Sequence, residues 1–262
     1  MATGVNAAAW SASFLFRGRG IWCMQAVQAR SKGEAFGSGF MRGIYSEIYR
    51  KHKGEDSPEL AKNNARKMLR ALASSLPEGS NYLGIGAGSG FTEAGMGYAF
   101  KKFGSVTILD IAKRRPKMSA KRGHGNVLNV EADAQVLPIK PDSMDLVSCL
   151  MSQDFYADRD VASREMFRVM KPGAHAVVFL HHPEMMRRNL GGGRLETAQA
   201  AFTAHLLEKQ RLFADKEALK SHYSRHGFKV ESVHEHVPGK LEPKGDYWWE
   251  VVLRKPEAVK GR

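Results

Sequence analysis

Residues 80–91 read Ser-Asn-Tyr-Leu-Gly-Ile-Gly-Ala-Gly-Ser-Gly-Phe, an apolar run that enters a turn with glycine at every second position from Gly84 to Gly90. Glycine has no Cβ and tolerates positive φ, so this backbone can bend sharply and approach a ligand closely. A strand followed by such a turn and a helix leaves free N–H groups facing the crevice beyond the strand. Folds of the α/β class hold nucleotide-like cofactors in this way. The stretch therefore predicts a cofactor site.

Short β-rich runs and helical patterns alternate on both sides of this turn, which indicates parallel βαβ units. The first helix has a Ser57 cap and Pro58 at its first position, and Pro77 ends it. Gly239 to Gly245 is expected to join the last two strands as a hairpin. We expect strands at 82–85, 106–110, 126–130, 144–150, 174–180, 228–237 and 246–254, and helices at 58–76, 91–102, 158–170, 183–212 and 215–226.

The composition suits one large domain with appendages, because 262 residues with 43% hydrophobic content can bury a sizeable core. We expect a basic, poorly ordered extension at residues 1–35 and one domain at 36–262, in which the helical insert 183–212 could cover a substrate. Two cysteines exclude a disulfide framework, and no Cys or His spacing suggests a metal site. No run of 18 apolar residues occurs in the sequence, so no transmembrane segment is expected.

The formal net charge is +13, and two explanations of it remain open. The basic residues either form a solvated surface or attract phosphates, as on RNA or a ribosome. Residues 1–33 contain no Asp or Glu and hold arginines among bulky apolar side chains, which resembles a mitochondrial transit peptide. The cytoplasm is the expected compartment, and the mitochondrial matrix is the alternative if this stretch is a transit peptide.

The glycine spacing narrows the choice of cofactor. A dinucleotide fingerprint needs GxGxxG, and the frames that start in this turn lack its last glycine. Gly86, Gly88 and Gly90 instead show GxGxG, the spacing that S-adenosylmethionine (SAM) sites generally have. Asp110 ends the second expected strand, where a carboxylate meets a ribose. Asp133 follows the third, where it can accept a hydrogen bond from the adenine amine.

Two further segments agree with these residues, namely Ser143–Val147 at the start of the fourth strand and Arg168–Gly173 at the end of the next helix. Together, the five segments resemble the class I SAM-dependent methyltransferases, especially the type 11 branch that includes ubiquinone and menaquinone methyltransferases. The resemblance covers residues 60–182. It implies a Rossmann-like α/β fold with seven mostly parallel strands, helices on both faces and an antiparallel last strand. It also implies an enzyme that transfers a methyl group from SAM.

The same resemblance implies which residues line the cofactor site. The methionine end of SAM would lie along residues 85–90, the ribose against Asp110, the adenine at Asp133 and the sulfonium region near Met151. The implied set is Ile85, Gly86, Ala87, Gly88, Gly90, Asp110, Ile111, Asp133, Ala134 and Met151.

One position departs from the family pattern. The family usually has an acidic residue two positions before the first glycine of GxGxG, and this chain has Gly84 there. Three explanations stay open: weaker cofactor binding, a substitute acid such as Glu93, or a protein that no longer catalyses.

The sequence leaves the acceptor open. A small molecule is the first hypothesis, RNA or protein the second, and a non-catalytic assembly or binding factor on the same scaffold the third. Methyl transfer needs orientation rather than a catalytic dyad, so no catalytic residue is assigned. His181 and His182 follow the fifth strand, and a histidine there is either a general base or a structural or surface histidine. Asp154, Tyr156 and Asp158 either contact substrate or cap the following helix.

Overall fold

A computed structural model describes residues 59–88, 90–112, 126–191, 213–237 and 247–257 of the chain. The expectations about the extension at 1–35, the segment 36–58, the second part of the helical insert and the hairpin connection at 239–245 lie outside these residues. The strands are β1 (Asn81–Ile85), β2 (Ser105–Asp110), β3 (Val127–Glu131), β4 (Met144–Leu150), β5 (Met170–His181), β6 (Lys229–His236) and β7 (Trp248–Arg254). The helices are α3 (Glu59–Ser75), α4 (Phe91–Ala94), η1 (Gly97–Phe100), η3 (Gln153–Phe155), α5 (Arg159–Val169), α6 (Pro183–Gly191) and α8 (Lys216–Arg225).

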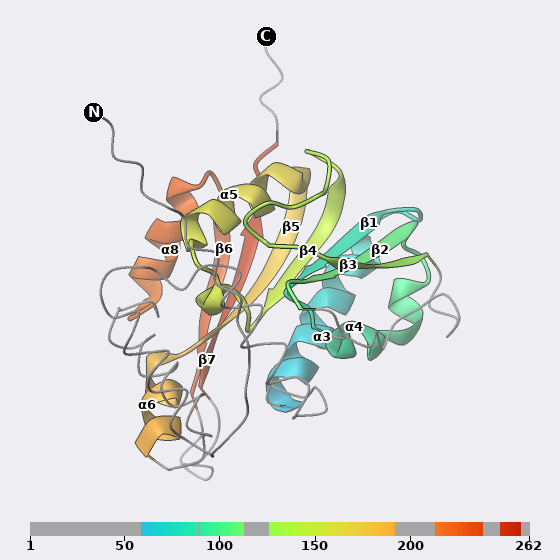
Figure 1. Cartoon of the computed structure of the whole chain (residues 1–262). Helices are drawn as coiled ribbons and strands as arrows, with labels where there is room; N and C mark the ends of the chain where they lie inside the picture. The colour runs from blue at the N-terminus through green and yellow to red at the C-terminus, as the bar shows by residue number, and fades with distance from the viewer. Residues whose placement is uncertain (1–58, 89, 113–125, 192–212, 238–246, 258–262) are drawn as a thin grey trace, which may run out of the picture.

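These strands form a single seven-stranded sheet in the order β3-β2-β1-β4-β5-β7-β6 (Figure 1). β1 pairs in parallel with β2 and β4, and β7 lies antiparallel between β5 and β6. The predicted mostly parallel sheet with an antiparallel last strand is confirmed. The chain adds strands outward from β1 to β3 and then returns to β4 on the other side of β1. Ligands of open α/β sheets bind beyond the carboxyl ends of the strands at such a switch point.

Helices cover both faces of this sheet. On one face α3 contributes Ala61, Ala65 and Leu69 to a buried cluster, and on the other α5 and α8 pack against a second cluster (Figure 1). Successive side chains of a strand point to opposite faces. Trp248 and Trp249 of β7 accordingly lie in different clusters.

The prediction of one helix over 91–102 is wrong. The structure has the short helix α4 and, after a break, the 3-10 helix η1. Gly97 has a φ of 58°, in the left-handed region that ends helices, so the α-helix cannot continue through it. β5 also begins four residues earlier than expected, at Met170, so Pro172 and Gly173 lie within the strand rather than before it.

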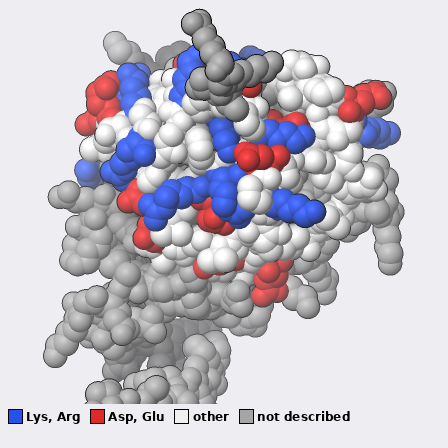
Figure 2. Space-filling model, turned by 90° about the horizontal axis from the view of Figure 1, so that it is seen from above, with Lys and Arg blue, Asp and Glu red and all other residues white. Residues whose placement is uncertain are grey.

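Acidic and basic side chains are mixed on the face of the molecule seen in Figure 2. Ion pairs in the described part of the chain include Lys171 with Asp145 at 2.8 Å and Lys255 with Asp142 at 2.6 Å. Figure 2 also shows a row of adjoining basic side chains across the middle of this face, with acidic side chains beside it. Among the described helices, none is both long and apolar enough to cross a bilayer.

Candidate functional site

The glycine turn leaves β1 with a left-handed backbone at three positions. The φ angles of Gly86, Gly88 and Gly90 are 62°, 60° and 71°, which side chains other than glycine rarely adopt. A Cβ on Gly86 would lie 2.5 Å from both Cβ and Oγ of Ser152. The Ser152 hydroxyl, just beyond β4, donates to the Ile85 carbonyl oxygen at 3.2 Å. The turn after β1 and the end of β4 thus meet at the switch point of the sheet.

Asp110 lies at the mouth of this turn. Its Oδ2 accepts a hydrogen bond from the Gly88 N–H at 2.8 Å, and its Oδ1 accepts one from the Ala112 N–H at 2.9 Å. The sequence predicted the proximity of Asp110 to the glycines but not these backbone bonds. A carboxylate at this position can accept hydrogen bonds from ribose hydroxyls. Ile111, the next residue, is half-buried.

Asp133 and Ala134 follow β3, beside the end of β2. The Ala132 N–H donates to the Asp110 carbonyl oxygen at 3.0 Å, which joins the two strand ends. Oδ1 of Asp133 accepts from the backbone N–H and the side-chain amide of Gln135, at 2.9 and 3.1 Å. Ala134 is buried. The aspartate is therefore held by its own turn, a feature that the sequence did not suggest.

The residues after β4 form a compact polar group. Met151 has a φ of 54°, an uncommon value for a residue with a side chain, and its N–H donates to the Phe179 carbonyl oxygen at 2.8 Å. The Ser152 hydroxyl lies 2.9 Å from the Tyr156 hydroxyl and 3.2 Å from Sγ of Cys149. Burial raises the pKa of the Cys149 thiol to about 11, so the thiol is neutral at pH 7 and is no nucleophile.

A buried carboxyl group lies beneath Gly84. The Tyr82 hydroxyl donates to Oε1 of Glu93 at 3.1 Å and lies 2.5 Å from the Ser148 hydroxyl. A Cβ on Gly84 would lie 2.9 Å from the same Oε1. Burial raises the pKa of Glu93 above its ordinary value. The Glu93 carboxyl group thus lies directly beside the position that the side chain of an acidic residue 84 would take.

Asp154, Tyr156 and Asp158 have different environments. Asp158 caps α5, since its side chain accepts from the Val161 N–H at 3.0 Å, as one of the two explanations expected. Asp154 is completely buried and does not cap that helix. Its Oδ2 instead accepts from the backbone N–H of His181 at 2.9 Å and lies 3.1 Å from Nδ1 of the same histidine.

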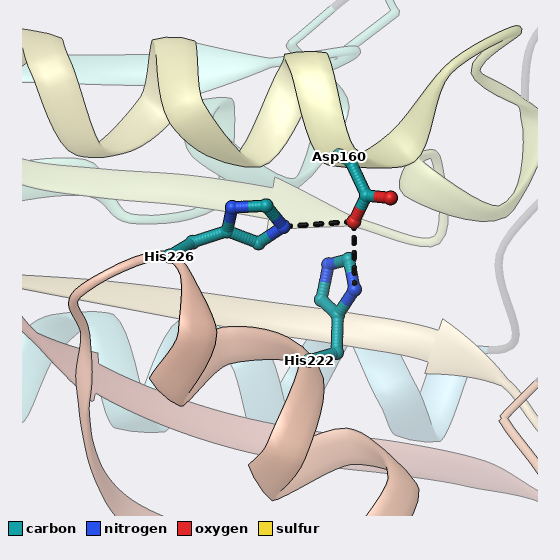
Figure 3. Close-up of side chains that lie close together, drawn as sticks. All are labelled: Asp160, His222 and His226. Carbon is teal, nitrogen blue, oxygen red and sulfur yellow. Dashed lines mark hydrogen bonds and ion pairs between the residues drawn. The ribbon is translucent and has the colours of Figure 1, made fainter.

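A second cluster of ionisable groups joins α5 to α8 (Figure 3). Oδ1 of Asp160 lies 2.8 Å from Nε2 of His226 and 3.4 Å from Nδ1 of His222. Nη2 of Arg225 lies 2.5 Å from the same Oδ1 and 3.1 Å from Nδ1 of His222. Carboxylate and imidazole atoms at such distances can hold a metal ion. Here, however, the Arg225 guanidinium already places a positive charge beside both Asp160 and His222. We interpret the cluster as an ion-pair hub that fastens the two helices.

The hub predicts a loss of stability in acid. The hydrogen bond from His226 holds the pKa of Asp160 down at about 2, below its ordinary 3.8. A lowered carboxyl pKa stabilises the fold above pH 3.8, and that stabilisation disappears as the pH falls toward 2. Because Asp160 is 45% exposed, Asp160→Asn should cost at most about 1 kcal/mol at pH 7. Urea unfolding at a series of pH values from 7 to 2 should show that the difference in free energy of unfolding between this variant and the native protein falls to zero.

Glu217→Gln is the matched control for that measurement. It removes an equal charge from α8 together with an ion pair to Lys220 that lies within one helix. We expect it to leave the free energy of unfolding nearly unchanged throughout. If Asp160→Asn behaves like this control, the hub does not fasten the helices.

Comparison with known proteins identifies the class. The family model described as "Methyltransferase domain" matches residues 83–178. The ubiquinone/menaquinone biosynthesis C-methyltransferase UbiE of Pseudoalteromonas translucida is 26% identical over 190 residues, which cover 66% of this chain and 75% of that protein. UbiE of Shewanella woodyi is 29% identical over 167 residues, covering 57% of this chain and 66% of that one.

Solved structures have the same fold at low sequence identity. A SAM-dependent methyltransferase from Aquifex aeolicus has a TM-score of 0.54 and 17% identity, over 84% of this chain and 99% of that one. The N-methyltransferase NodS of Bradyrhizobium japonicum, solved with S-adenosyl-L-homocysteine, has a TM-score of 0.55 and 14% identity, over 81% and 98%. The resemblance inferred from the glycine turn and the aspartates is confirmed by these matches. The protein is a SAM-dependent methyltransferase.

Proposed function

We propose that this methyltransferase acts on an apolar small molecule and binds SAM at the glycine turn. The observation that carries the cofactor site is the hydrogen bond between the Gly88 N–H and Asp110 at the switch point of the sheet. The full set proposed to line the site is Ile85, Gly86, Ala87, Gly88, Gly90, Asp110, Ile111, Asp133, Ala134 and Met151.

The site fits this cofactor on two structural grounds. Three glycines in the left-handed region leave backbone without side chains where the methionine end would lie. A carboxylate stands one strand away, at the position for a ribose. SAM, when bound, supplies a methyl group whose bond to sulfur breaks with its electron pair going to sulfur. The protein has to orient the acceptor and exclude water, and orientation alone can lower the barrier by roughly 7–11 kcal/mol.

Support for an apolar acceptor comes from apolar side chains near the carboxyl ends of β4 and β5. Met185 and Met186 of α6 form a small buried cluster with Phe155 and Tyr247 packed against it. These residues follow the carboxyl ends of β4 and β5 or lie beside them. We propose that the insert 183–212, of which α6 is the described part, covers the acceptor within a domain at 36–262. The UbiE relatives are C-methyltransferases of ubiquinone and menaquinone biosynthesis, which agrees with an apolar acceptor.

Glu93 is proposed to replace the acid that the family has at the position of Gly84. Its carboxyl group lies under the turn, held by the Tyr82 hydroxyl. It can order the turn from below without a side chain at residue 84. This explains how a chain with Gly84 can retain cofactor binding.

The cofactor assignment predicts a large effect of Asp110→Ala. The variant loses both ribose hydrogen bonds and the bond from the Gly88 N–H, and each bond to a charged group is worth about 1.5–3 kcal/mol. We expect calorimetry to show SAM affinity reduced at least about tenfold, with 1.4 kcal/mol per factor of ten. Asp145→Ala, at the opposite end of the sheet, is the control and should bind SAM normally. An unchanged affinity in Asp110→Ala would remove the ribose assignment.

The acceptor class is tested by transfer of isotope-labelled methyl groups into fractionated cell extract. Label in the organic-soluble metabolites is the expected result. Label in RNA or protein would show that the proposed acceptor class is wrong. Label in RNA would agree with the alternative that the net charge of +13 attracts phosphates. Absence of transfer, with SAM bound, would favour a binding factor on this scaffold.

A further inference from the structure

A histidine and a buried carboxylate meet at the carboxyl ends of β4 and β5. His181 is the last residue of β5, and Asp154 lies in η3, just beyond β4. Because a carboxylate only accepts hydrogen bonds, the proton on the imidazole lies on Nδ1, which faces Asp154 Oδ2 at 3.1 Å. The other ring nitrogen, Nε2, then carries a lone pair. It has no hydrogen-bond partner among the described residues.

The carboxylate of Asp154 is poorly compensated. Its side chain is completely buried, and both of its hydrogen bonds among the described residues come from His181. Oδ1 is buried and has no partner there. A buried negative charge with so few donors is stabilised when a positive charge forms beside it. Proton uptake by His181 would provide that charge.

The neighbouring histidine cannot serve in the same way. Nδ1 of His182 accepts from the Glu184 N–H at 3.1 Å, and Nε2 lies 3.1 Å from Oε1 of Glu235. Both ring nitrogens are therefore engaged by the protein. Of the two adjacent histidines, His181 alone keeps an unengaged ring nitrogen among the described residues.

The surroundings of His181 are apolar and aromatic. The Phe155 ring meets the His181 ring edge-on, with centroids 5.1 Å apart. Phe155 also packs against Met185 and Met186, and Tyr247 packs against the same pair. Planar apolar rings and polarisable methionines favour contact with another ring. A ring that carries one ionisable hydroxyl group matches this combination.

We propose that His181 is the general base of the methyl transfer, that Asp154 is its positioning residue, and that the acceptor is an apolar ring compound with an acidic hydroxyl group. The inference rests on the proposed small-molecule function. Nε2 takes the hydroxyl proton, so the O–H bond breaks, an N–H bond forms and the electron pair stays on the acceptor oxygen. That pair, on oxygen or delocalised onto a ring carbon, is what attacks the methyl group. Asp154 holds the imidazole in position and stabilises the imidazolium.

The test uses the full-length protein with S-adenosylhomocysteine and 4-nitrophenol, whose anion absorbs at longer wavelength than its neutral form. At a fixed pH where the free probe is mostly neutral, the native protein should give a saturable anion band. His181→Gln should reduce that band at least about tenfold, and Asp154→Asn should reduce it in part. With an acceptor in hand, His181→Gln should lower kcat by roughly 10²- to 10⁴-fold with little change in KM.

The matched control is His175→Gln, on the same strand. His175 also pairs with a carboxylate, Glu231 at 3.2 Å, but in the middle of β5 rather than at its end. It should leave both the anion band and kcat unchanged. Affinity for S-adenosylhomocysteine, measured by calorimetry, should stay within about twofold in all variants, which shows that they fold.

Two failures are distinguishable. If the native protein gives no saturable anion band, or if His181→Gln gives the same band, the base assignment is overturned while cofactor binding stands. If S-adenosylhomocysteine does not bind the native protein at all, the proposed function itself is wrong.

Discussion

Gly86→Ala should weaken SAM binding severely. The substitution places a side chain in the left-handed region, at a cost of about 1–2 kcal/mol. It also drives a Cβ to 2.5 Å from Ser152, and overpacking of this kind costs about 1–3 kcal/mol more. Relief of that contact requires the turn to move away from β4, out of the position for the cofactor. We expect calorimetry to show SAM affinity reduced by about 100-fold or more.

Gly97→Ala separates the two costs. Gly97 has a φ of 58°, close to that of Gly86, but a Cβ there would meet nothing within 4 Å. This variant should lose about 1–2 kcal/mol of stability and keep SAM affinity. Ser152→Gly combined with Gly86→Ala removes the two nearest obstructing atoms and leaves the Tyr156 hydroxyl at 2.9 Å, so it should restore part of the binding. If Gly86→Ala and Gly97→Ala bind SAM equally well, close approach at the turn is unimportant.

Gly84→Asp should destabilise the protein strongly, although it restores the acid that the family usually has. Gly84 is buried, and a Cβ there would lie 2.9 Å from Oε1 of Glu93 and 3.1 Å from Cβ of Ala87. The new carboxyl group would share a dry site with Glu93, and one of the two could not ionise. Overpacking costs about 1–3 kcal/mol, and burial of a further carboxyl group without a partner costs about 1–3 kcal/mol more. Thermal and urea unfolding measure the loss.

The decisive test is the stability and SAM affinity of the double variant that combines Gly84→Asp with Glu93→Ala. Glu93→Ala alone removes the acceptor of the Tyr82 hydroxyl and should cost about 1–3 kcal/mol. The combination removes the conflict at residue 84 and supplies a carboxyl group from the strand, so it should be more stable than Gly84→Asp and recover SAM binding. A double-mutant cycle without coupling between the two sites would show that Glu93 does not stand in for the family acid.

Much of the architecture could be predicted because it depends on local patterns. The parallel strands, the glycine turn and the carboxylate of Asp110 all follow from residues close together in the sequence. The break between α4 and η1 could not be predicted, since a glycine inside a helical pattern only weakens it, and the left-handed φ of Gly97 depends on its tertiary context.

The chemistry of the site was harder to predict, because its partners are far apart in the chain. Asp154 and His181 are separated by 27 residues and meet only because β4 and β5 are neighbours. Tyr82 and Ser148 meet in the same way across β1 and β4. A substitute acid such as Glu93 was one of the three explanations that the sequence left open for Gly84, but its position beneath Gly84 depends on the packed turn. The sequence contains no periodic signal for such pairs.

The insertion of β7 between β5 and β6 also affects how the chain can be made. β5 is complete long before Trp248 to Arg254 have been synthesised. Until then, the backbone N–H and C=O groups along one of its edges have no partner strand. β6 has no place in the sheet until the same residues arrive, because it pairs with β7 rather than with β5. Two of the seven strands, β6 and β7, therefore join the sheet only after Trp248 to Arg254 have been made, and the nascent chain is exposed to aggregation until then. A stop codon just before Trp248 should therefore give an insoluble product, because β5 and β6 would both lack their partner strand.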